Sequence, residues 1–493
     1  MVCSQSRADA AAAPSPIILL PHMKRGLPGL LVPLAAAICA GLVLFIWLAG
    51  MPRVQLPARI PGTDRPSPGA SAEPAAGPRG QLETGPGQPA AIGGAWPGFR
   101  GPNRDGVSSE AVRLATTWGA GGPPALWKIE LGEGYAGPAV QDGRVYVLDF
   151  DAAAQADVVR CLSLADGKDI WRYSYPVKIK RNHGMSRTVP AVSGRHVVTI
   201  GPKCHVFCLD AQTGECRWMI DMVRTFGTKV PPWYAGQCPL IDRGRAILAP
   251  AGKALMVAVD CDTGKLAWET PNPHAWEMTH SSVTPMEFKG RRMYVYCASR
   301  GVVGVSADDG AIMWETPDWK ISIANIPSPV TLGDGRIFLS GGYEAGCMML
   351  QLKETNGAFA VETLWRLPAR EFGATQQTPI LFEGFLYGVR PDGQLACLSP
   401  EGKIVWSSGV GHRFGLGPFL VADGLLYVVN DEGRLSLSRA TPREFALLAE
   451  AQVLGGHDSW GPLAVAGGRL LARDLTTMVC LDVSASVGGA PAK

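Results

Sequence analysis

A glycine turn between two apolar runs recurs eight times between residues 142 and 468 of this 493-residue chain. The first turn, for example, stands between Ala139-Val140 and Val145-Tyr146-Val147. The eight turns are Asp142-Gly143, Ser193-Gly194, Arg243-Gly244, Lys289-Gly290, Asp334-Gly335, Glu383-Gly384, Asp423-Gly424 and Gly467-Gly468. Glycine supplies the positive φ that a tight hairpin needs. The recurrence therefore predicts eight hairpins in repeated units of roughly 45 residues.

A tryptophan ends most of these units. The tryptophans are Trp127, Trp171, Trp218, Trp268, Trp314, Trp365 and Trp406, with successive gaps of 41 to 51 residues. A second glycine turn precedes most of them, as Asp166-Gly167 precedes Trp171. Four antiparallel strands at this period are typical of a β-propeller blade. We therefore predict an all-β fold, an eight-bladed β-propeller over residues 120–484.

The series of glycine turns and the series of tryptophans, the two registers of the repeat, are offset at the ends of the repeat region. Trp127 precedes the first glycine turn, whereas the turn at Gly468 is followed by no tryptophan. We expect the strand Leu126–Leu131 to complete the last blade, because pairing the two ends of the repeat removes two exposed sheet edges. The unit around Gly424 lacks a tryptophan, so a seven-bladed ring with that segment as an insertion is the alternative.

The N-terminal part predicts a membrane anchor and a linker. Residues 26–52 contain no Asp, Glu, Lys, Arg or His, and the apolar run from Leu30 to Gly50 is long enough to span a bilayer as a helix. We predict a cytoplasmic segment over 1–25, in which Met23 is a second candidate start, and a transmembrane signal anchor over 26–51, with a cleaved signal as the alternative. Residues 52–94, rich in Pro, Gly and Ala, predict a disordered linker, and 485–493 a flexible tail. The order of these elements indicates a single-pass protein of the inner (cytoplasmic) membrane whose propeller lies on the periplasmic, extracytoplasmic side.

The charge balance excludes one class of partner. Lys and Arg number 46 and Asp and Glu 43, so the chain has no strong positive electrostatic field that would hold nucleic acid. No Cys-x-x-Cys or His-Glu-x-x-His motif predicts a metal site. Cys161, Cys208, Cys397 and Cys480 share one repeat position, which indicates buried packing residues more than disulfides.

Each unit closes on a common pattern, as in Cys208-Leu209-Asp210-Ala211-Gln212-Thr213-Gly214-Glu215-Cys216-Arg217-Trp218. This pattern resembles the repeat of pyrroloquinoline-quinone (PQQ)-like β-propellers over about residues 120–484. The superfamily includes eight-bladed quinoprotein alcohol dehydrogenases and BamB-like outer-membrane assembly factors. Residues 95–119, beginning Trp96-Pro97-Gly98-Phe99-Arg100-Gly101-Pro102, resemble the lead-in segment of planctomycete-type PQQ-like repeat proteins.

This chain differs in two features from the quinoprotein alcohol dehydrogenases of that superfamily. Those enzymes carry a disulfide between adjacent cysteines beside the quinone, and this chain has no Cys-Cys pair. They also hold Ca²⁺ with a Glu/Asn/Asp set, which the motifs of this chain do not place.

The candidate binding residues lie on the loops that lead into the first strand of each blade. In a propeller these loops surround one end of the central channel, where polar and aromatic side chains from all blades converge into a concave site. The candidates are Tyr135, Arg187, Trp233, Gln237, His280, Asn325, Gln376, Arg413, Asp458 and Trp460. The alternative is that these side chains only solvate the channel rim.

We therefore expect a non-catalytic binding or scaffold module that takes a protein or small-molecule ligand at this end of the channel, without a cofactor. One alternative is a dehydrogenase of alcohols or sugars that uses PQQ and Ca²⁺. In that case the contacts to cofactor or metal would come from His280, Asn325, Gln376, Arg187 and Asp458, with Asp458 as the base. The other alternative is a BamB-like factor that docks a partner peptide on a blade edge or loop.

Overall fold

The computed structural model of this chain describes residues 38–46 and 78–485. The chain divides into two units, Met1–Pro74 and Ala75–Lys493. In the first unit, residues 38–46 form a helix. Within the described ranges, no helix has the length and apolar character that crossing a membrane requires. Most of the predicted anchor 26–51 and of the predicted tail 485–493, together with the N-terminal segment 1–25, lies outside the described residues.

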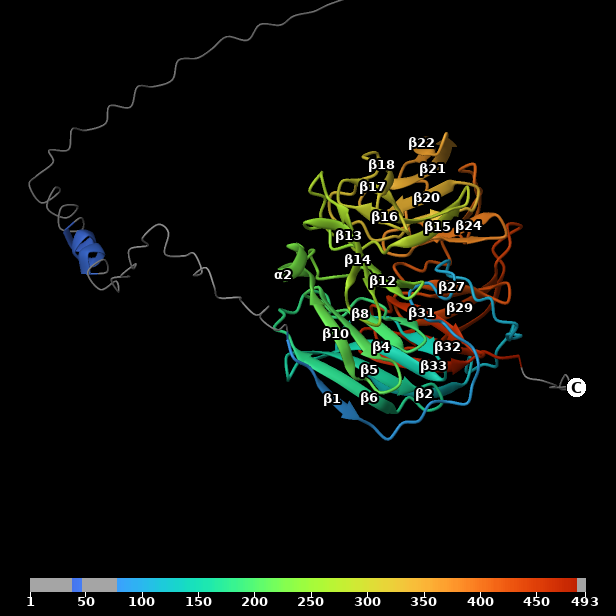
Figure 1. Ribbon diagram of the computed structural model, residues 1–493. Helices are drawn as coiled ribbons and strands as arrows, with labels where there is room; N and C mark the ends of the chain where they lie inside the picture. Colours follow the sequence, from blue (N-terminus) through green and yellow to red (C-terminus); the bar gives the residue numbers. More distant parts are fainter. Residues whose placement is uncertain (1–37, 47–77, 486–493) are drawn as a thin grey trace, which may run out of the picture. The chain divides into compact units, whose positions relative to one another are not determined.

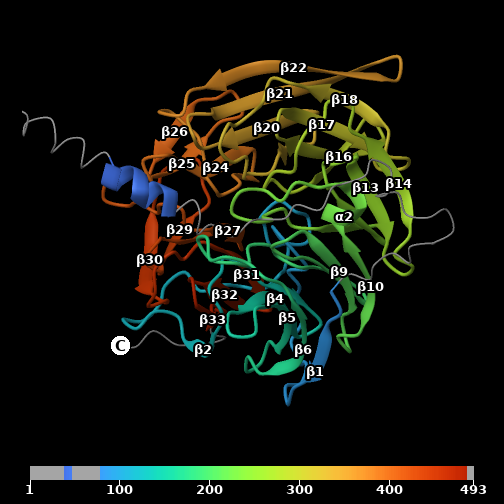
Figure 2. The same cartoon turned by 90° about the vertical axis from the view of Figure 1, so that its left-hand side faces the viewer.

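Residues 78–485 form eight sheets arranged in a ring, which the chain completes one after another (Figures 1 and 2). Each sheet is an antiparallel blade of four strands, and the first carries a fifth. The first strands of most neighbouring blades contact one another around the central channel. The predicted eight-bladed β-propeller is thus confirmed.

Blades are numbered here along the chain, and blades 1 to 4 hold sixteen strands. Blade 1 comprises β3 (Ala139–Gln141), β4 (Arg144–Asp151), β5 (Ala156–Ser163) and β6 (Asp169–Pro176). Blade 2 comprises β7 (Ala191–Ser193), β8 (His196–Ile200), β9 (His205–Asp210) and β10 (Cys216–Asp221). Blade 3 comprises β11 (Leu240–Asp242), β12 (Arg245–Leu248), β13 (Ala254–Asp260) and β14 (Leu266–Pro271). Blade 4 comprises β15 (Thr284–Phe288), β16 (Arg291–Ala298), β17 (Gly301–Ser306) and β18 (Ile312–Thr316).

Blades 5 to 8 continue the ring. Blade 5 comprises β19 (Val330–Thr331), β20 (Arg336–Gly341), β21 (Gly346–Thr355) and β22 (Ala358–Leu367). Blade 6 comprises β23 (Ile380–Phe382), β24 (Phe385–Val389), β25 (Leu395–Leu398) and β26 (Ile404–Ser407). Blade 7 comprises β27 (Phe419–Ala422), β28 (Leu425–Val429), β29 (Arg434–Arg439) and β30 (Leu447–Gln452). Blade 8 comprises β31 (Gly461–Ala466), β32 (Arg469–Arg473), β33 (Thr477–Asp482) and β2 (Ala125–Glu130).

The position of a strand within its blade decides its burial. The third strand of blade 1, β5, is buried at every residue, because the blade is packed between two neighbours. The fourth strand of blade 5, β22, alternates exposed and half-buried residues along its whole length. Such alternation is what the period of two of a β-strand gives when only one face is covered.

The repeated tryptophans join neighbouring blades. The indole N–H of Trp171 in blade 1 donates to the carbonyl oxygen of Ala211 in blade 2 at 3.3 Å. The same ring lies against Gly214 of blade 2, where an added Cβ would come within 2.7 Å of it. The indoles that likewise donate to a carbonyl of the next blade are those of Trp127, Trp218, Trp268, Trp365 and Trp406. The second glycine turn of a unit and the tryptophan of the preceding blade therefore form one contact.

The third strand carries a small residue opposite every repeat tryptophan except Trp365, which lies opposite Met349. Cys161 pairs with Trp171, and Cys480 pairs with Trp127. Cys208 and Cys397 occupy the same position opposite their own tryptophans. All four thiols are free and buried, as the shared repeat position indicates.

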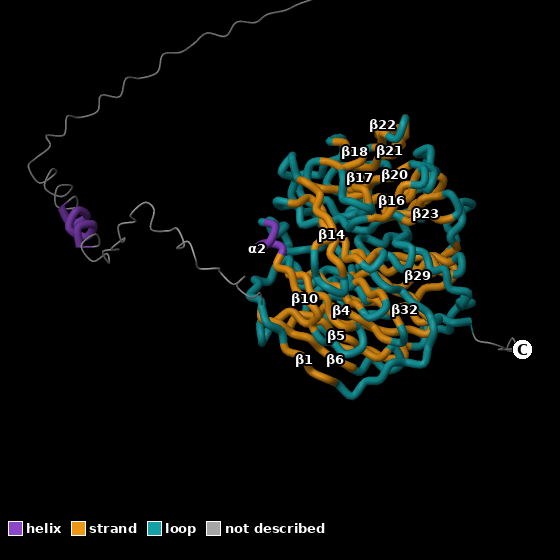
Figure 3. The backbone as a smooth tube through the Cα atoms, viewed as in Figure 1, coloured by secondary structure: helices purple, strands orange, loops and turns teal. Residues whose placement is uncertain are grey.

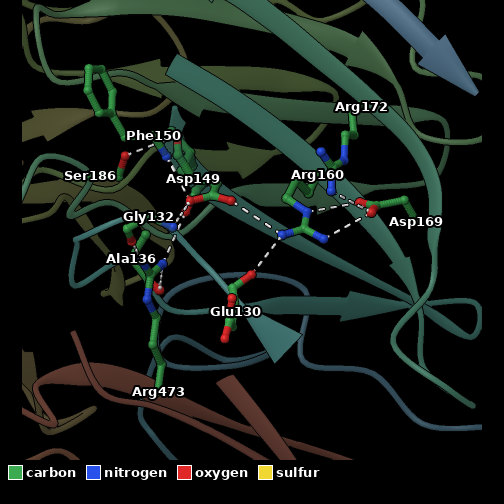
Figure 4. Close-up of polar contacts among 11 residues, drawn as sticks. Glu130, Gly132, Ala136, Asp149, Phe150, Arg160, Asp169, Arg172, Ser186 and Arg473 are labelled. Atoms are coloured by element: carbon green, nitrogen blue, oxygen red, sulfur yellow. Dashed lines mark hydrogen bonds and ion pairs between the residues drawn. The ribbon is translucent and has the colours of Figure 1, made fainter. Parts of the chain in front are cut away.

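The ring closes by pairing the two ends of the repeat region. β2 runs antiparallel to β33, with Trp127 opposite Cys480. Arg473 of β32, 1% exposed, reinforces the junction by donating to the carbonyls of Gly132, Ala136 and Leu148 at 2.8, 3.1 and 3.1 Å (Figure 4). The predicted closing strand is confirmed. The seven-bladed alternative is wrong, because the unit around Gly424 forms the complete blade 7.

The linker predicted over 52–94 ends earlier than expected. β1 (Gln81–Thr84) adds an edge strand to blade 1 by pairing with β6, with Leu82 opposite Tyr173. An edge strand pairs through its backbone, so its Pro- and Gly-rich surroundings gave no apolar signal. Within residues 78–485 the single helix is α2 (Met222–Phe226), which Asp221 caps at its N-terminus (Figure 3).

Candidate functional site

The loops that lead into the first strands surround a cavity of about 330 Å³ at one end of the channel. We call this end the mouth. Six of the ten predicted site residues line the cavity, contributed by blades and loops around the ring. They are Tyr135, Arg187, Trp233, His280, Gln376 and Trp460.

The other four predicted residues lie elsewhere. Gln237 is fully buried, and its amide exchanges hydrogen bonds with the backbone of Ala249, so its role is structural. Asn325 is 3% exposed, and neither polar atom of its side chain has a partner among the described residues. Arg413 lines a separate depression of about 340 Å³, together with Asp392 and Asp431 among others.

The fourth of these, Asp458, lies behind Tyr135 instead of lining the cavity, and accepts a 3.4 Å hydrogen bond from the Tyr135 hydroxyl. The ring of Tyr135 lies 5.1 Å from that of Trp460, centroid to centroid. Burial, and after it the Asp458 carboxylate, raises the pKa of Tyr135 to about 12. At neutral pH Tyr135 is therefore an uncharged wall residue.

The closure network positions the loop that carries Tyr135. The N–H of Gly132 donates to the Asp149 carboxylate at 2.6 Å, and Arg473 holds the carbonyls of Gly132 and Ala136 from blade 8 (Figure 4). Arg160 in turn holds the second oxygen of Asp149 at 3.3 Å. Ring closure and the shape of the mouth therefore depend on the same contacts.

Arg187 is one of the two arginines of the cavity wall, with Arg100. Its guanidinium donates to the carbonyls of Trp233, Asn182 and His183, and lies over the ring of Tyr135 at 5.2 Å. Burial lowers the pKa of Arg187 to about 10, so it keeps its charge at neutral pH. Cationic groups over aromatic faces are attracted by the ring quadrupole. The wall thus offers a fixed positive charge beside flat apolar surfaces.

His280 is neutral at physiological pH. Burial, and after it the charge of Arg187, lowers the pKa of His280 to about 4. Its ring lies 6.4 Å from that of Trp233 and packs on Gly236, where an added Cβ would come within 2.6 Å of the imidazole. Only glycine fits at that position of the wall.

Sequence reasoning missed one group of lining residues. Trp96, Phe99, Arg100 and Gly106 of the lead-in segment form part of the cavity. The motif that contains them was visible in the sequence, but it falls outside the repeat, so no periodicity indicated where it lies. Other lining residues absent from the prediction include His183 and Tyr343.

The residues present do not fit a calcium-dependent quinone cofactor. No group of three or more His, Cys, Asp or Glu that could hold a metal ion occurs in the described part of the chain. The cavity lining in particular contains no carboxylate. Ca²⁺ takes six to eight oxygen ligands, mainly carboxylates and carbonyls, so this wall lacks its usual charged ligands.

The ring of eight four-stranded blades with a docking tryptophan in most of them defines a PQQ-like β-propeller with a cavity at its mouth. Residues 155–408, about half of the chain, match the family described as "Outer membrane protein assembly factor BamB", and the chain belongs to this family of PQQ-like propellers.

Two curated relatives are similar to this chain over very different lengths. The chain is 23% identical over 328 residues to an outer membrane protein assembly factor BamB of Moranella endobia, covering 64% of this chain and 68% of that protein. It is 28% identical over 146 residues to the quinohemoprotein alcohol dehydrogenase ADH IIB of Pseudomonas putida, covering 27% of this chain and 19% of that enzyme. The likeness to the dehydrogenase is thus confined to a short part of the enzyme.

Solved structures show the same fold. BamB from Moraxella catarrhalis superposes with a TM-score of 0.52 at 14% identity, over 73% of this chain and 99% of that one. A europium-containing methanol dehydrogenase superposes with a TM-score of 0.55 at 13% identity, over 79% and 89%. At these identities the likeness establishes the propeller fold alone.

Proposed function

We propose that this protein is a non-catalytic binding module that takes its ligand in the mouth cavity. The observation that carries the proposal is the make-up of the cavity wall. Aromatic and cationic side chains converge on about 330 Å³, and no carboxylate is among the lining residues. A concave site with aromatic walls and few polar groups is the usual form of a ligand pocket.

The charge of the wall favours an anionic ligand with a flat apolar part. Arg187 keeps its positive charge although it is partly buried, and charge attraction is stronger there than in bulk water. Tyr135, Trp233 and Trp460 supply the flat surfaces beside it. An anionic group with a flat apolar part can belong to a small molecule or to a segment that a partner protein inserts into the mouth.

A BamB-like role is the second candidate, and it too would use the mouth. The family match supports a protein partner. Exposed apolar side chains on the loops of the same end favour protein contact: Ile323 is 53% exposed, Tyr343 40% and Val410 77%. Outer-membrane assembly itself rests on the name of the relative alone.

The chemistry of the wall supports binding more than catalysis. With no Asp or Glu among the lining residues, the wall offers no carboxylate base, and the Asp458 carboxylate contacts the Tyr135 hydroxyl and the Nδ1 of His457, both at 3.4 Å. His280 is uncharged, and Tyr135 keeps its proton at neutral pH. General acid-base catalysis works best with a pKa near the operating pH, which neither group has.

A matched set of naphthalenes tests the proposal. The full chain in lipid nanodiscs is titrated calorimetrically with naphthoate, naphthylmethanol and naphthylmethylammonium, which share a ring system and differ in charge. We expect naphthoate to bind most tightly and the ammonium most weakly. Arg187→Gln should weaken naphthoate binding about tenfold or more, because a hydrogen bond to a charged group is lost.

The control is Arg413→Gln, a predicted mouth residue that lies outside the cavity, and it should leave all three affinities unchanged. Equal binding of the anion and the cation, or equal effects of the two arginine variants, would overturn the proposal. Titration with PQQ, with and without Ca²⁺, followed by dye reduction with an alcohol, decides the dehydrogenase alternative.

The proposal includes an anchor at residues 26–51, with the propeller on the extracytoplasmic side. Its support is the apolar run of the sequence, which is long enough to cross a bilayer. We expect the full chain to resist carbonate extraction from membranes and to be digested by protease added to spheroplasts. Release by carbonate, or protection from the protease, contradicts this part.

A further inference from the structure

The lead-in segment enters and leaves the propeller from the end opposite the mouth. Before it, the N–H of Ala90 donates to the carbonyl of Gly143 at 3.0 Å. Towards its end, the N–H of Leu114 donates to the side chain of Asp423 at 3.0 Å. Both partners lie in turns between the first and second strands of a blade, and in an antiparallel blade these turns face away from the loops of the mouth.

One carboxylate ties the two ends of this excursion together. Glu110 accepts a hydrogen bond from the N–H of Ala95 at 2.7 Å and another from the N–H of Gly467 at 2.8 Å. The chain therefore leaves the far end of the channel at Ala95 and is held near the same place at Glu110. The residues between them form an inserted loop.

This loop, Trp96–Val107, crosses the channel from one side to the other. On one side Trp96 exchanges two 2.8 Å hydrogen bonds with Val140 of blade 1, and Pro97 accepts one from Val192 of blade 2. On the other side the N–H of Val421 in blade 7 donates to Gly106 at 3.0 Å.

The loop is also tied to blade 6 by Arg100, whose guanidinium donates to the carbonyls of Thr378 and Pro379 at 2.9 and 3.0 Å. Blades 2 and 6 are diametrically opposite in a ring of eight. We call Trp96–Val107 the plug.

Two residues of the plug, Arg100 and Gly106, have contacts that other residue types could not make. The same guanidinium of Arg100 donates to the carbonyls of Arg104 and Asp105 of the plug, so it closes the loop on itself while it holds blade 6. Gly106 has a φ of 82°, and an added Cβ would come within 2.8 Å of Ile380. A positive φ in a crowded site requires glycine.

We propose that the plug is the floor of the binding cavity: it closes the channel so that ligands pass only through the mouth, and Trp96 and Phe99 set the depth of the cavity and so the size of the ligand. This inference rests on the proposed function, because it concerns the same cavity. It assigns ligand contacts to a segment outside the repeat.

The surroundings of Phe99 make the depth of the cavity measurable. Phe99 and Arg100 line the mouth cavity, and they also line a void of about 10 Å³ that lies against blades 3 to 5. Cys238 of blade 3 lines both spaces. Truncating Phe99 should therefore join the two spaces and deepen the cavity.

The first arm of the test is ligand size. In the full chain in nanodiscs, we expect Phe99→Ala to raise the affinity for the three-ring anthracene carboxylate, relative to the two-ring naphthoate, by about tenfold, because more apolar surface is buried. The matched control is Asn103→Ala, an exposed plug residue that lines neither space. If the wild type binds naphthoate and Phe99→Ala leaves the ratio unchanged, the size assignment is overturned while the proposed function stands.

The second arm measures closure without any ligand. Cys238, 5% exposed, reports on the floor, and Cys161 and Cys297, which are buried and line neither the cavity nor the void, report on unfolding. Arg100→Gln removes the charged hold on blade 6 and should raise the rate of Cys238 labelling by a charged methanethiosulfonate several-fold, with Cys161 and Cys297 still protected. An unchanged Cys238 rate would overturn closure by the plug. Absence of naphthoate binding in the wild type would instead overturn the proposed function, and the labelling result would still decide closure.

Discussion

Replacing Arg473 tests whether ring closure carries a large share of the stability of the propeller. The side chain is 1% exposed and donates three hydrogen bonds from blade 8 to the carbonyls of Gly132, Ala136 and Leu148. Arg473→Met keeps most of the apolar volume but leaves three carbonyls without their donor. A buried polar group that loses its partner costs about 1–3 kcal/mol.

The expected loss is about 3–5 kcal/mol, since three carbonyls lose a charged donor and partial relaxation recovers some of the cost. It should appear as a lower urea midpoint with an unchanged slope, which is the sign of a change in stability alone. Burial lowers the pKa of Arg473 to about 10, so the side chain is charged at the neutral pH of the assay.

Arg469→Met is the matched control. It lies on the same strand, β32, four residues earlier, and donates one hydrogen bond to the carbonyl of Leu164 at 3.0 Å. We expect it to cost about 1 kcal/mol. If the two variants lose the same stability, the bonds of Arg473 do not hold the junction, and the reasoning from closure is refuted.

Three further predictions follow from particular contacts. Burial raises the pKa of Asp157 to about 7, although hydrogen bonds from Tyr175 and Ser186 lower it. Between about pH 4 and 7 the folded state therefore holds a proton that the unfolded state has released. The free energy of unfolding should fall by up to about 4 kcal/mol as the pH rises through this range. Urea midpoints of Asp157→Asn should lack this slope and exceed those of the wild type at pH 8; a parallel slope contradicts it. Trp171→Phe should lower the stability of the propeller by about 1 kcal/mol more than Trp314→Phe does. The reason is that Trp171 donates to a carbonyl of the next blade, whereas Trp314 donates only to the sulfur of Met293. Equal losses of stability in thermal melts refute this. Glu110→Gln should speed amide hydrogen exchange in the plug and leave the blades protected, since it weakens the contacts to Ala95 and Gly467; uniform acceleration argues against a local role.

The blades were predictable because one physical contact is repeated around the ring. A tryptophan at the end of one blade needs a glycine in the next blade, as Trp171 needs Gly214, and the two residue types recur in phase along the sequence. The strand Leu126–Leu131 followed from the offset between the two registers. By contrast, β1 pairs through backbone groups on the edge of blade 1, and such pairing leaves no pattern in the side chains.

The candidate site was predictable only as far as the repeat reaches. The loops of the mouth follow from the blade register, and six of the ten residues chosen on them line the cavity. The register does not say which way a loop side chain points. Gln237 turns to the backbone of Ala249, and Arg413 turns to a neighbouring depression, for reasons that lie in the local packing.

The repeat also explains why the specificity of the cavity should lie outside it. Eight similar blades give a channel with nearly eightfold walls, and such a channel has no preferred orientation for an asymmetric ligand. Asymmetry enters where the sequence leaves the repeat: at Arg187 and Trp233 on unequal loops, and at the plug with Trp96 and Phe99. A channel without the plug would also be open at both ends. A single inserted loop from the opposite end therefore supplies both the closure and the asymmetry that a selective pocket needs.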